Sequence, residues 1–527
     1  MIRIDRFHLP SFNAPSTEGG LLREARFWAF LSAVPGILAA SLLFLSVRQL
    51  WIPCAGMVAA GIALVLPIEY AIFAFLGYLS IEGALKINSN YNPIVHVGGD
   101  LLLMVLLIRS FLDRRSGGFA KYPHTPFFKV IAIFSIWLFL QFVNPFGLGL
   151  APSIAGSKLY LSMIFFAFLI FHHLERKHID ALFLCVVVLA TVQAVLASVE
   201  YLYGQSFVLA LHSRYKTIAG ARFVGSLYRP FGTSAVPGGP SVWIFLTSPM
   251  AMYLLIKPNG SLVKMIFAGL FFAASIPALF FCQVRTAMVI FAVGAVAVGG
   301  FPGQGFKKRM GRMSLILAVA AIVLFPKVEA FFLAPDVADV PVSALKNAAA
   351  APTQATGGNG KAGEISSAQM EKLTERFGSL GKKGTFTSAR SGALDAMIEL
   401  GQQTIFGIGL SRVGAASALW AARIASDPLF GLKWSFGDNL YRTIFTELGL
   451  PGLVAWLTMI GLILSFLVRT SLDSTLKVDH FLLWTCAMAV VLLLLGGWGS
   501  EGILYTPVST IFWLYIAVGL KEAYSGG

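Results

Sequence analysis

Long runs of apolar residues recur along the 527-residue chain, each about as long as a helix that crosses a membrane. Short polar segments separate them. Together they predict about fourteen transmembrane helices. The runs lie at 27–47, 53–67, 68–83, 95–112, 127–143, 156–172, 179–203, 238–256, 264–282, 286–300, 313–327, 443–468, 479–497 and 502–520. The pattern therefore predicts an all-α, polytopic integral membrane protein.

Two longer polar segments interrupt this pattern and divide the chain into five parts. These are N-terminal helices in 1–203, a loop in 204–237, central helices in 238–327, a large loop in 328–442 and C-terminal helices in 443–527. The first apolar run begins near Phe27 and has no small-residue cleavage pattern at its end, so we expect a retained helix.

The large loop changes character along its length. A tract of Ala, Gly, Pro and Thr from Ala348 to Gly363 has no apolar periodicity and is expected to be flexible. Apolar residues then recur at helical spacing, for example at Leu394, Met397 and Ile398. We expect the second half of the loop to pack as amphipathic helices on the membrane face.

Composition supports a membrane protein and excludes a nucleic-acid partner. The chain is 57% hydrophobic and 12% charged, which is more apolar surface than a soluble core could bury. Its formal net charge of +15 would suggest nucleic-acid binding in a soluble protein. Here, however, most of the basic residues lie in short loops between apolar runs, as they do in membrane proteins.

These basic loops also predict the orientation of the chain. They contain Arg114, Arg115, Lys121, Arg176, Lys177, Lys257, Lys264, Lys307, Lys308, Arg309, Arg312, Arg469 and Lys477. The positive-inside rule assigns them to the cytoplasm, which puts both termini in the cytoplasm and the loops 204–237 and 328–442 outside. We expect the bacterial inner membrane, with the outer side facing the periplasm.

No motif indicates a metal or a cofactor. The four cysteines stand singly in apolar segments, at Cys54, Cys185, Cys282 and Cys486, and we interpret them as small hydrophobic residues. His172, His173 and His178 lie beside Arg176 and Lys177 at a predicted inner helix end, which favours a cluster facing lipid headgroups over a metal site. Segment 357–362 lacks the Ser or Thr that a nucleotide-binding loop has after its lysine.

Arginines on the predicted outer side are candidates for binding an anion. The loop 204–237 contains Arg214, Lys216, Arg222 and Arg229 but no acidic residue. Such a loop fits an anionic ligand, or else a solvated surface near lipid headgroups. Arg285 stands between two apolar runs with almost no loop around it, so it is either a site residue or an arginine that reaches the membrane interface.

The most informative stretch is 437–452, where the large loop re-enters the membrane. It contains Asp438, Asn439, Arg442 and Glu447. If the stretch is helical, Asp438 and Arg442 lie one turn apart, and the Gly449-Leu450-Pro451-Gly452 segment bends the chain into the next span. The alternative is a charged helix start followed by a Gly/Pro break.

This stretch resembles the signature of the O-antigen ligase/polymerase family of bacterial membrane glycosyltransferases. That signature is His, then Asn, Ser or Gln, then nine residues and Gly-x-x-Gly. Here Asp438-Asn439 is followed by nine residues and Gly449-x-x-Gly452, with Asp438 in place of the His. The resemblance covers about 220–465 and includes 228–237, Arg285, and Arg390 with the turn 407–409.

The resemblance implies a GT-C-like fold and a metal-independent transfer of a glycan from an undecaprenyl-pyrophosphate donor. It implies that Arg229, Arg285 and Arg390, together with Arg214 and Arg442, bind the pyrophosphate. Because a pyrophosphate leaves readily, arginines that balance its charge can replace a metal. The acceptor hydroxyl needs a general base, for which Asp438 is the first candidate and Glu447 the second, with Asn439 orienting the groups.

Three functions stay open at this point. A polymerase would join lipid-linked repeat units, a ligase would transfer the glycan to lipid A core or to protein, and a flippase would move it across the membrane. The aspartate at 438 favours polymerisation, and the large outer loop favours an enzyme. The expected partners are the lipid-linked donor, a lipid-linked or glycan acceptor, membrane lipids and a chain-length regulator.

Overall fold

A computed structural model provides the fold. The structure describes residues 66–88, 93–112, 126–211, 223–224, 227–234, 238–257, 260–282, 284–299, 391–413, 439–497 and 507–525, and the single residues Ser417, Trp420, Ile424, Ser426, Asp427 and Leu504. The chain divides into Met1–Trp51 and Ile52–Gly527, and all described residues belong to the second unit.

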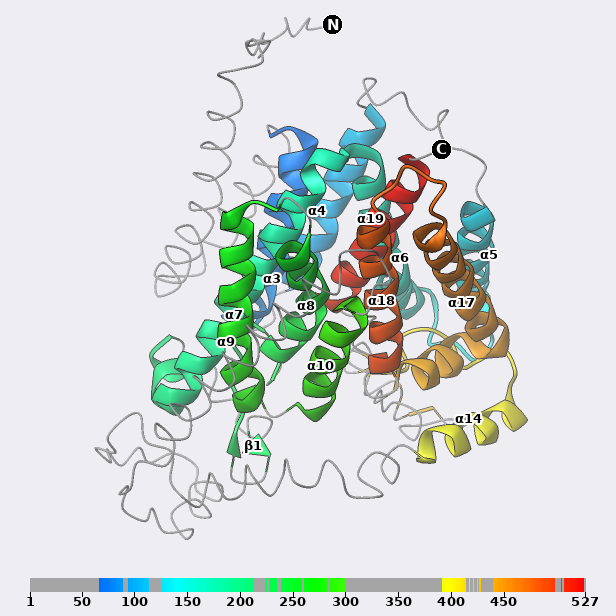
Figure 1. The fold of residues 1–527 in the computed structure, drawn as a ribbon. Helices are drawn as coiled ribbons and strands as arrows, with labels where there is room; N and C mark the ends of the chain where they lie inside the picture. Colours follow the sequence, from blue (N-terminus) through cyan, green and yellow to red (C-terminus); the bar gives the residue numbers. More distant parts are fainter. Residues whose placement is uncertain are drawn as a thin grey trace, which may run out of the picture. The chain divides into compact units, whose positions relative to one another are not determined.

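The described residues form helices, apart from one short hairpin (Figure 1). The helices are α3 (Ile68–Asn88), α4 (Pro93–Leu112), α5 (Pro126–Leu140), α6 (Leu150–His173), α7 (Arg176–Leu211), α8 (Pro240–Ile256), α9 (Leu262–Cys282), α10 (Arg285–Gly299), α14 (Ser391–Gln403), α17 (Leu440–Leu472), α18 (His480–Gly497) and α19 (Val508–Ser525), with a 3-10 turn η3 (Gln141–Val143). The hairpin pairs β1 (Phe223–Val224) with β2 (Leu227–Tyr228).

Six helices in the described residues are long and apolar enough to cross a membrane. They span Ile68–Lys86, Leu150–His173, Arg176–Tyr203, Leu262–Cys282, Leu440–Leu472 and His480–Gly497. Two shorter apolar helices, Lys129–Val143 and Pro240–Ile256, accompany them. This is the helical membrane architecture expected from the sequence, because a helix satisfies its own backbone groups in lipid. The predicted spans 27–47, 53–67 and 313–327 fall wholly or mostly outside the described residues.

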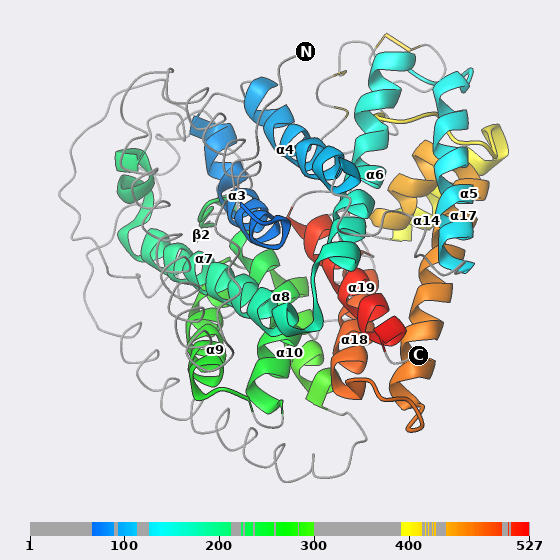
Figure 2. The same ribbon diagram turned by 90° about the horizontal axis from the view of Figure 1, so that it is seen from above.

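The helices pack in two connected groups. Helices α7, α8 and α9 contact one another, and α10 lies against both α8 and α18 (Figure 2). On the other side of α18, α17 and α19 pack against it, α6 packs against α19, and α5 packs against α17. Helix α18 therefore connects the two groups.

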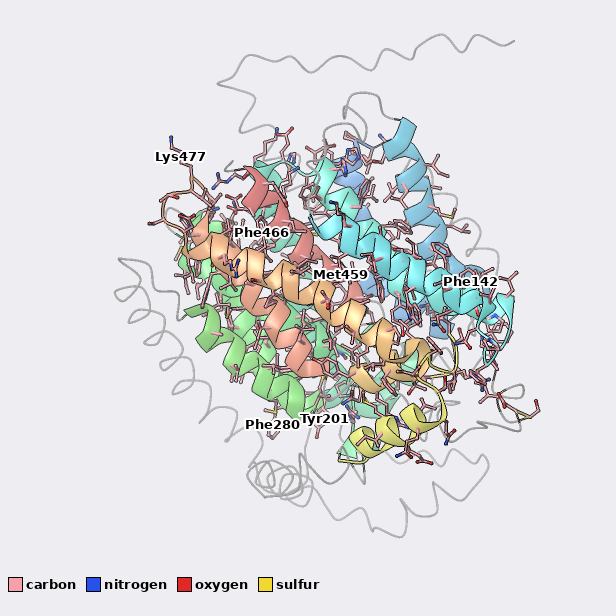
Figure 3. The ribbon with its side chains drawn as sticks, turned by 90° about the vertical axis from the view of Figure 1, so that its right-hand side faces the viewer. Phe142, Tyr201, Phe280, Met459, Phe466 and Lys477 are labelled. Carbon is pink, nitrogen blue, oxygen red and sulfur yellow. The ribbon has the colours of Figure 1, made fainter. Side chains whose placement is uncertain are left out.

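Polar contacts join the helix ends at each end of the bundle. At one end, which we call the basic end, Lys257 Nζ lies 2.7 Å and Lys264 Nζ 2.9 Å from the Asp180 carboxylate. At the other, which we call the kink end, Tyr441 at the start of α17 donates to Leu494 O near the end of α18, at 2.7 Å. Figure 3 shows Lys477 at the basic end, and Tyr201 and Phe280 at the opposite end.

Several helix ends differ from the ends of the predicted apolar runs. Helix α7 continues to Leu211 and the hairpin follows it, so the predicted loop 204–237 begins as helix. The last helix, α19, starts at Val508 and not at 502. Helix α17 starts at Leu440 because the preceding Asn439 has extended backbone angles and caps it. Asp438, the residue before this cap, lies outside the described residues.

Candidate functional site

Helix α17 breaks at Gly449, as the Gly449-Leu450-Pro451-Gly452 segment predicted. Gly449 has φ +72°, a left-handed conformation that glycine adopts readily. The break affects two carbonyl groups in the preceding turn. Leu450 N donates to Ile405 O instead of to Thr446 O, and Pro451 has no N–H to offer to Glu447 O.

The segment 404–413, which we call the clamp loop, supplies the missing partners. Ile408 N donates to Thr446 O at 2.8 Å, and Gly409 N donates to Glu447 O at 3.2 Å. The next carbonyl, Leu448 O, accepts from the Trp137 indole of α5 at 2.8 Å. The polar backbone at the kink is therefore satisfied by residues from other parts of the chain, as a membrane interior requires.

Glycines allow the clamp loop and the kink to approach each other closely. A Cβ atom on Gly407, whose φ is +79°, would lie 2.5 Å from Gly449 N. A Cβ atom on Gly449 would lie 2.3 Å from Ile405 O, and one on Gly452 would lie 2.8 Å from Trp137 Nε1. The turn 407–409 and the segment 449–452 are therefore parts of one interlocked structure.

The clamp loop also contacts the residues that follow α5 and those that begin α6. Asn144 Nδ2 donates to Gly407 O at 3.2 Å, and Ser411 Oγ donates to Pro152 O at 2.7 Å. Ser411 is fully buried and has φ +63°, a conformation that is rare outside glycine. Backbone strain of this kind often lies at functional sites.

Two oppositely charged residues, one beside the clamp loop and one within it, are buried. Glu447 is 1% exposed, and its carboxylate accepts from Tyr160 OH at 2.8 Å and from Val413 N at 3.3 Å. Arg412 is 3% exposed; it donates to Phe146 O at 2.6 Å and forms an ion pair with Asp427. The sequence analysis named Glu447 as a candidate, but it did not name Tyr160 or Arg412.

The start of α17 carries the two predicted residues that precede Glu447. Asn439 Oδ1 accepts from Arg442 N at 3.0 Å, so this side chain caps the helix. Arg442 Nε is buried without a hydrogen-bond partner in the described part of the chain. Glu447 lies five positions after Arg442 in the helix, which puts their side chains on different faces.

Arg229 forms a second part of the candidate site. Its Nε donates to Cys282 O at the end of α9, at 3.1 Å. Among the described residues it has no carboxylate partner, and burial lowers the pKa of its guanidinium from the ordinary value. A Cβ atom on Gly238 would lie 2.5 Å from Arg229 Nη2 and 3.0 Å from Val284 Cγ2. Arg285 begins α10 directly after Val284, so the two arginines belong to neighbouring segments.

Helix α18 links these two parts. Near its end, Leu494 O accepts from Tyr441 in the first turn of α17. In the same turn, a Cβ atom on Gly496 would lie 2.9 Å from Ile290 Cδ1 in the second turn of α10. The helix starts that carry Arg285 and Arg442 therefore flank the same end of α18.

Most of the remaining predicted site residues lie outside the described part of the chain. Asp438, Arg390 and Arg214 lie outside the described residues, and for Arg285 only the backbone position is described. No group of three or more His, Cys, Asp or Glu within the described ranges is arranged to hold a metal ion. His173 Nε2 contacts Ser110 Oγ at 2.6 Å, and the described cysteines are buried and unpaired.

The arrangement is suited to binding an anion beside Arg229 and to holding the start of α17 against the clamp loop. No protein-family model and no curated protein sequence matches the chain. The functional conclusion therefore depends on the residues themselves and on the motif resemblance that they carry.

Proposed function

We propose that the chain is a membrane glycosyltransferase that polymerises oligosaccharide repeat units carried on polyprenyl pyrophosphate. The reaction takes place at the kink end, which we assign to the periplasmic side of a bacterial inner membrane. The observation that carries the proposal is the half-buried Arg229, which has no carboxylate partner in the described part of the chain and lies beside the start of α10 at Arg285. A partly desolvated positive charge without a carboxylate partner among the described residues favours an anionic ligand.

The interlock between the clamp loop and the kink supports the same proposal. The turn 407–409 and the segment 449–452 were separate parts of the sequence resemblance, and in the fold they pack on each other. Their contact fixes the position of the kink in α17 relative to the clamp loop. A rigid frame of this kind is what a transferase needs to hold two substrates in register.

The proposed reaction uses few groups. The pyrophosphate of the donor binds Arg229 and Arg285, with Arg390, Arg214 and Arg442 as further contacts. The acceptor hydroxyl oxygen attacks the anomeric carbon, and the bond from that carbon to the pyrophosphate oxygen breaks. The hydroxyl proton passes to the Asp438 carboxylate, and the polyprenyl pyrophosphate leaves with its electron pair held by the arginines.

Mass spectrometry of lipid-linked glycans in a deletion strain tests the proposal. We expect single repeat units to accumulate on the periplasmic leaflet, and wild-type protein to restore polymer while Arg229→Ala does not. Full-length polymer left on the lipid would indicate a ligase instead. Repeat units held on the cytoplasmic leaflet would indicate a flippase, and an unchanged glycan profile would contradict any role in glycan assembly.

A further inference from the structure

The turn that carries Arg229, residues 229–234, is held by buried side chains of α7. Phe231 N donates to both oxygens of Glu200 at 3.0 Å, and Gly232 N donates to Glu200 Oε2 at 2.7 Å. Thr233 N donates to Gln193 Oε1 at 3.1 Å. Glu200 is 3% and Gln193 2% exposed, so these bonds are shielded from water.

A contact with α3 fixes the same turn from another side. The Ser80 carbonyl of α3 accepts from Gln193 Nε2 at 3.0 Å, and it also accepts from the Thr233 hydroxyl. Gly232 has φ +55°, and a Cβ atom there would lie 2.8 Å from Pro240 Cγ and 2.9 Å from Gln193 Oε1. Helices α3 and α7 and the start of α8 therefore determine the position of the turn.

These bonds determine which groups are left to bind an anion. Successive backbone N–H groups in a turn form a common binding site for phosphates. Here the N–H groups of Phe231, Gly232 and Thr233 already donate to side chains of α7. An anion at this turn must therefore be bound by the Arg229 guanidinium, whose position depends on how the turn is held.

We propose that Glu200 is a positioning residue for Arg229. Its carboxylate fixes the turn on α7, so that the guanidinium lies at the end of α9 next to Val284 and Arg285. The inference rests on the proposed function, in which Arg229 binds the pyrophosphate of the donor. It adds a residue of α7 that neither the sequence pattern nor the motif resemblance indicated.

Charge and position predict opposite effects of removing this carboxylate. If Glu200 acted only through its negative charge, Glu200→Gln and Glu200→Ala would strengthen the binding of an anion near Arg229. If it positions Arg229, both changes weaken that binding, and Glu200→Ala weakens it more because it removes the carboxylate that accepts from the Phe231 and Gly232 N–H groups. The direction of the change separates the two roles.

The test measures the binding of inorganic pyrophosphate to the full-length protein in detergent, by the rise in its unfolding temperature. We expect Glu200→Ala to weaken binding roughly tenfold, within the range for residues coupled in one network. The double variant with Arg229→Ala should bind no more weakly than Arg229→Ala alone. Gly232→Ala displaces the turn without removing Glu200, so it should weaken pyrophosphate binding to a similar extent. It replaces Glu200→Ala in the test if that variant does not fold.

Glu522→Gln is the matched control. Glu522 is also a fully buried carboxylate that accepts from a backbone N–H, that of Asp479 at 2.7 Å, but it lies at the basic end. Its change should lower the unfolding temperature and leave pyrophosphate binding intact. If Arg229→Ala loses pyrophosphate binding but Glu200→Ala and Gly232→Ala keep it, the role of Glu200 is overturned and the anion site at Arg229 is not. Failure of the wild-type protein to bind pyrophosphate would overturn the proposed anion site as well.

Discussion

At the scale of single residues, the two candidate carboxylates differ in what surrounds them. Glu447 is enclosed, and its oxygens already accept from Tyr160 and from Val413 N. A general base must instead lie within hydrogen-bond reach of the substrate hydroxyl. The contacts of Glu447 are those of a residue that holds the clamp loop against α6. Asp438, which directly precedes the cap of α17, is therefore the better candidate for the base.

The first prediction tests this assignment. Asp438→Asn keeps the size of the side chain but removes its ability to take a proton, so turnover should fall by roughly two to four orders of magnitude. Asp438→His, which recreates the residue of the resembling family, should restore part of the activity. The measurement is elongation of a lipid-linked repeat unit by purified protein.

Glu447→Gln is the control for that experiment. It should lower the unfolding temperature, because an amide replaces a charged acceptor of buried hydrogen bonds, and it should reduce turnover less than Asp438→Asn. Near-normal elongation by the Asp438→Asn variant would show that Asp438 has no role as a base.

The second prediction concerns the arginines. Lysine keeps the charge but loses the planar pair of donors, so Arg229→Lys, Arg285→Lys and Arg390→Lys should impair polymerisation severely if each binds pyrophosphate through two bonds. Arg176→Lys is a suitable control, because Arg176 is 56% exposed and pairs with Glu522 at the basic end. Polymer of wild-type length in all three variants would remove these residues from the site.

At the scale of elements, the kink in α17 depends on backbone geometry. Gly449 combines a positive φ with a close approach of the clamp loop, whereas Gly461 in the same helix has nothing within 4 Å of an added Cβ atom. An alanine would therefore clash with the clamp loop at position 449 but have free space at position 461 of the same helix.

The third prediction uses that contrast. Gly449→Ala should destabilise the protein by about 1–3 kcal/mol or more, because it adds a left-handed alanine and a clash with Ile405 O. Gly461→Ala should be neutral or stabilise by up to about 1 kcal/mol, since alanine favours the helix. Thermal unfolding in detergent compares the two. An unfolding temperature that falls equally in both would mean that the clamp contact contributes nothing.

The kink was predictable from sequence, but the clamp was not. A Gly-x-Pro-Gly segment inside an apolar run breaks a helix by local chemistry, so Gly449 and Pro451 are visible in the pattern. The groups that satisfy the break are distant in the chain: Trp137 lies 311 residues from Leu448, and Tyr160 lies 287 residues from Glu447. Nothing in the local pattern around Trp137, Tyr160 or Arg412 distinguishes them from ordinary core residues.

At the scale of the whole molecule, the directions of the described helices place the basic segments at one end of the bundle and the candidate site segments at the other. Helices α7, α9 and α18 start at the basic end. There, Lys264 of α9 pairs with Asp180 of α7, and Tyr253 of α8 donates to Asp180 and to Asp479, the residue before α18. The segments that carry Arg229 and the clamp loop lie at the other end. The apolar pattern predicted these helices, but not α7's extension to Leu211, because the polar segment after 203 resembled a loop.

The fourth prediction is the orientation of this arrangement. Because the basic end contains Arg176, Lys177, Lys257 and Lys477, the positive-inside rule predicts that this end lies in the cytoplasm and the segment 328–442 outside. A protein lacking its native cysteines and carrying Gly358→Cys should therefore react with an impermeant thiol reagent in cells whose inner membrane is intact. Lys477→Cys in the same background should react only after that membrane is breached. The reverse pattern would put the proposed pyrophosphate site on the cytoplasmic side, where a periplasmic polymerase cannot have it.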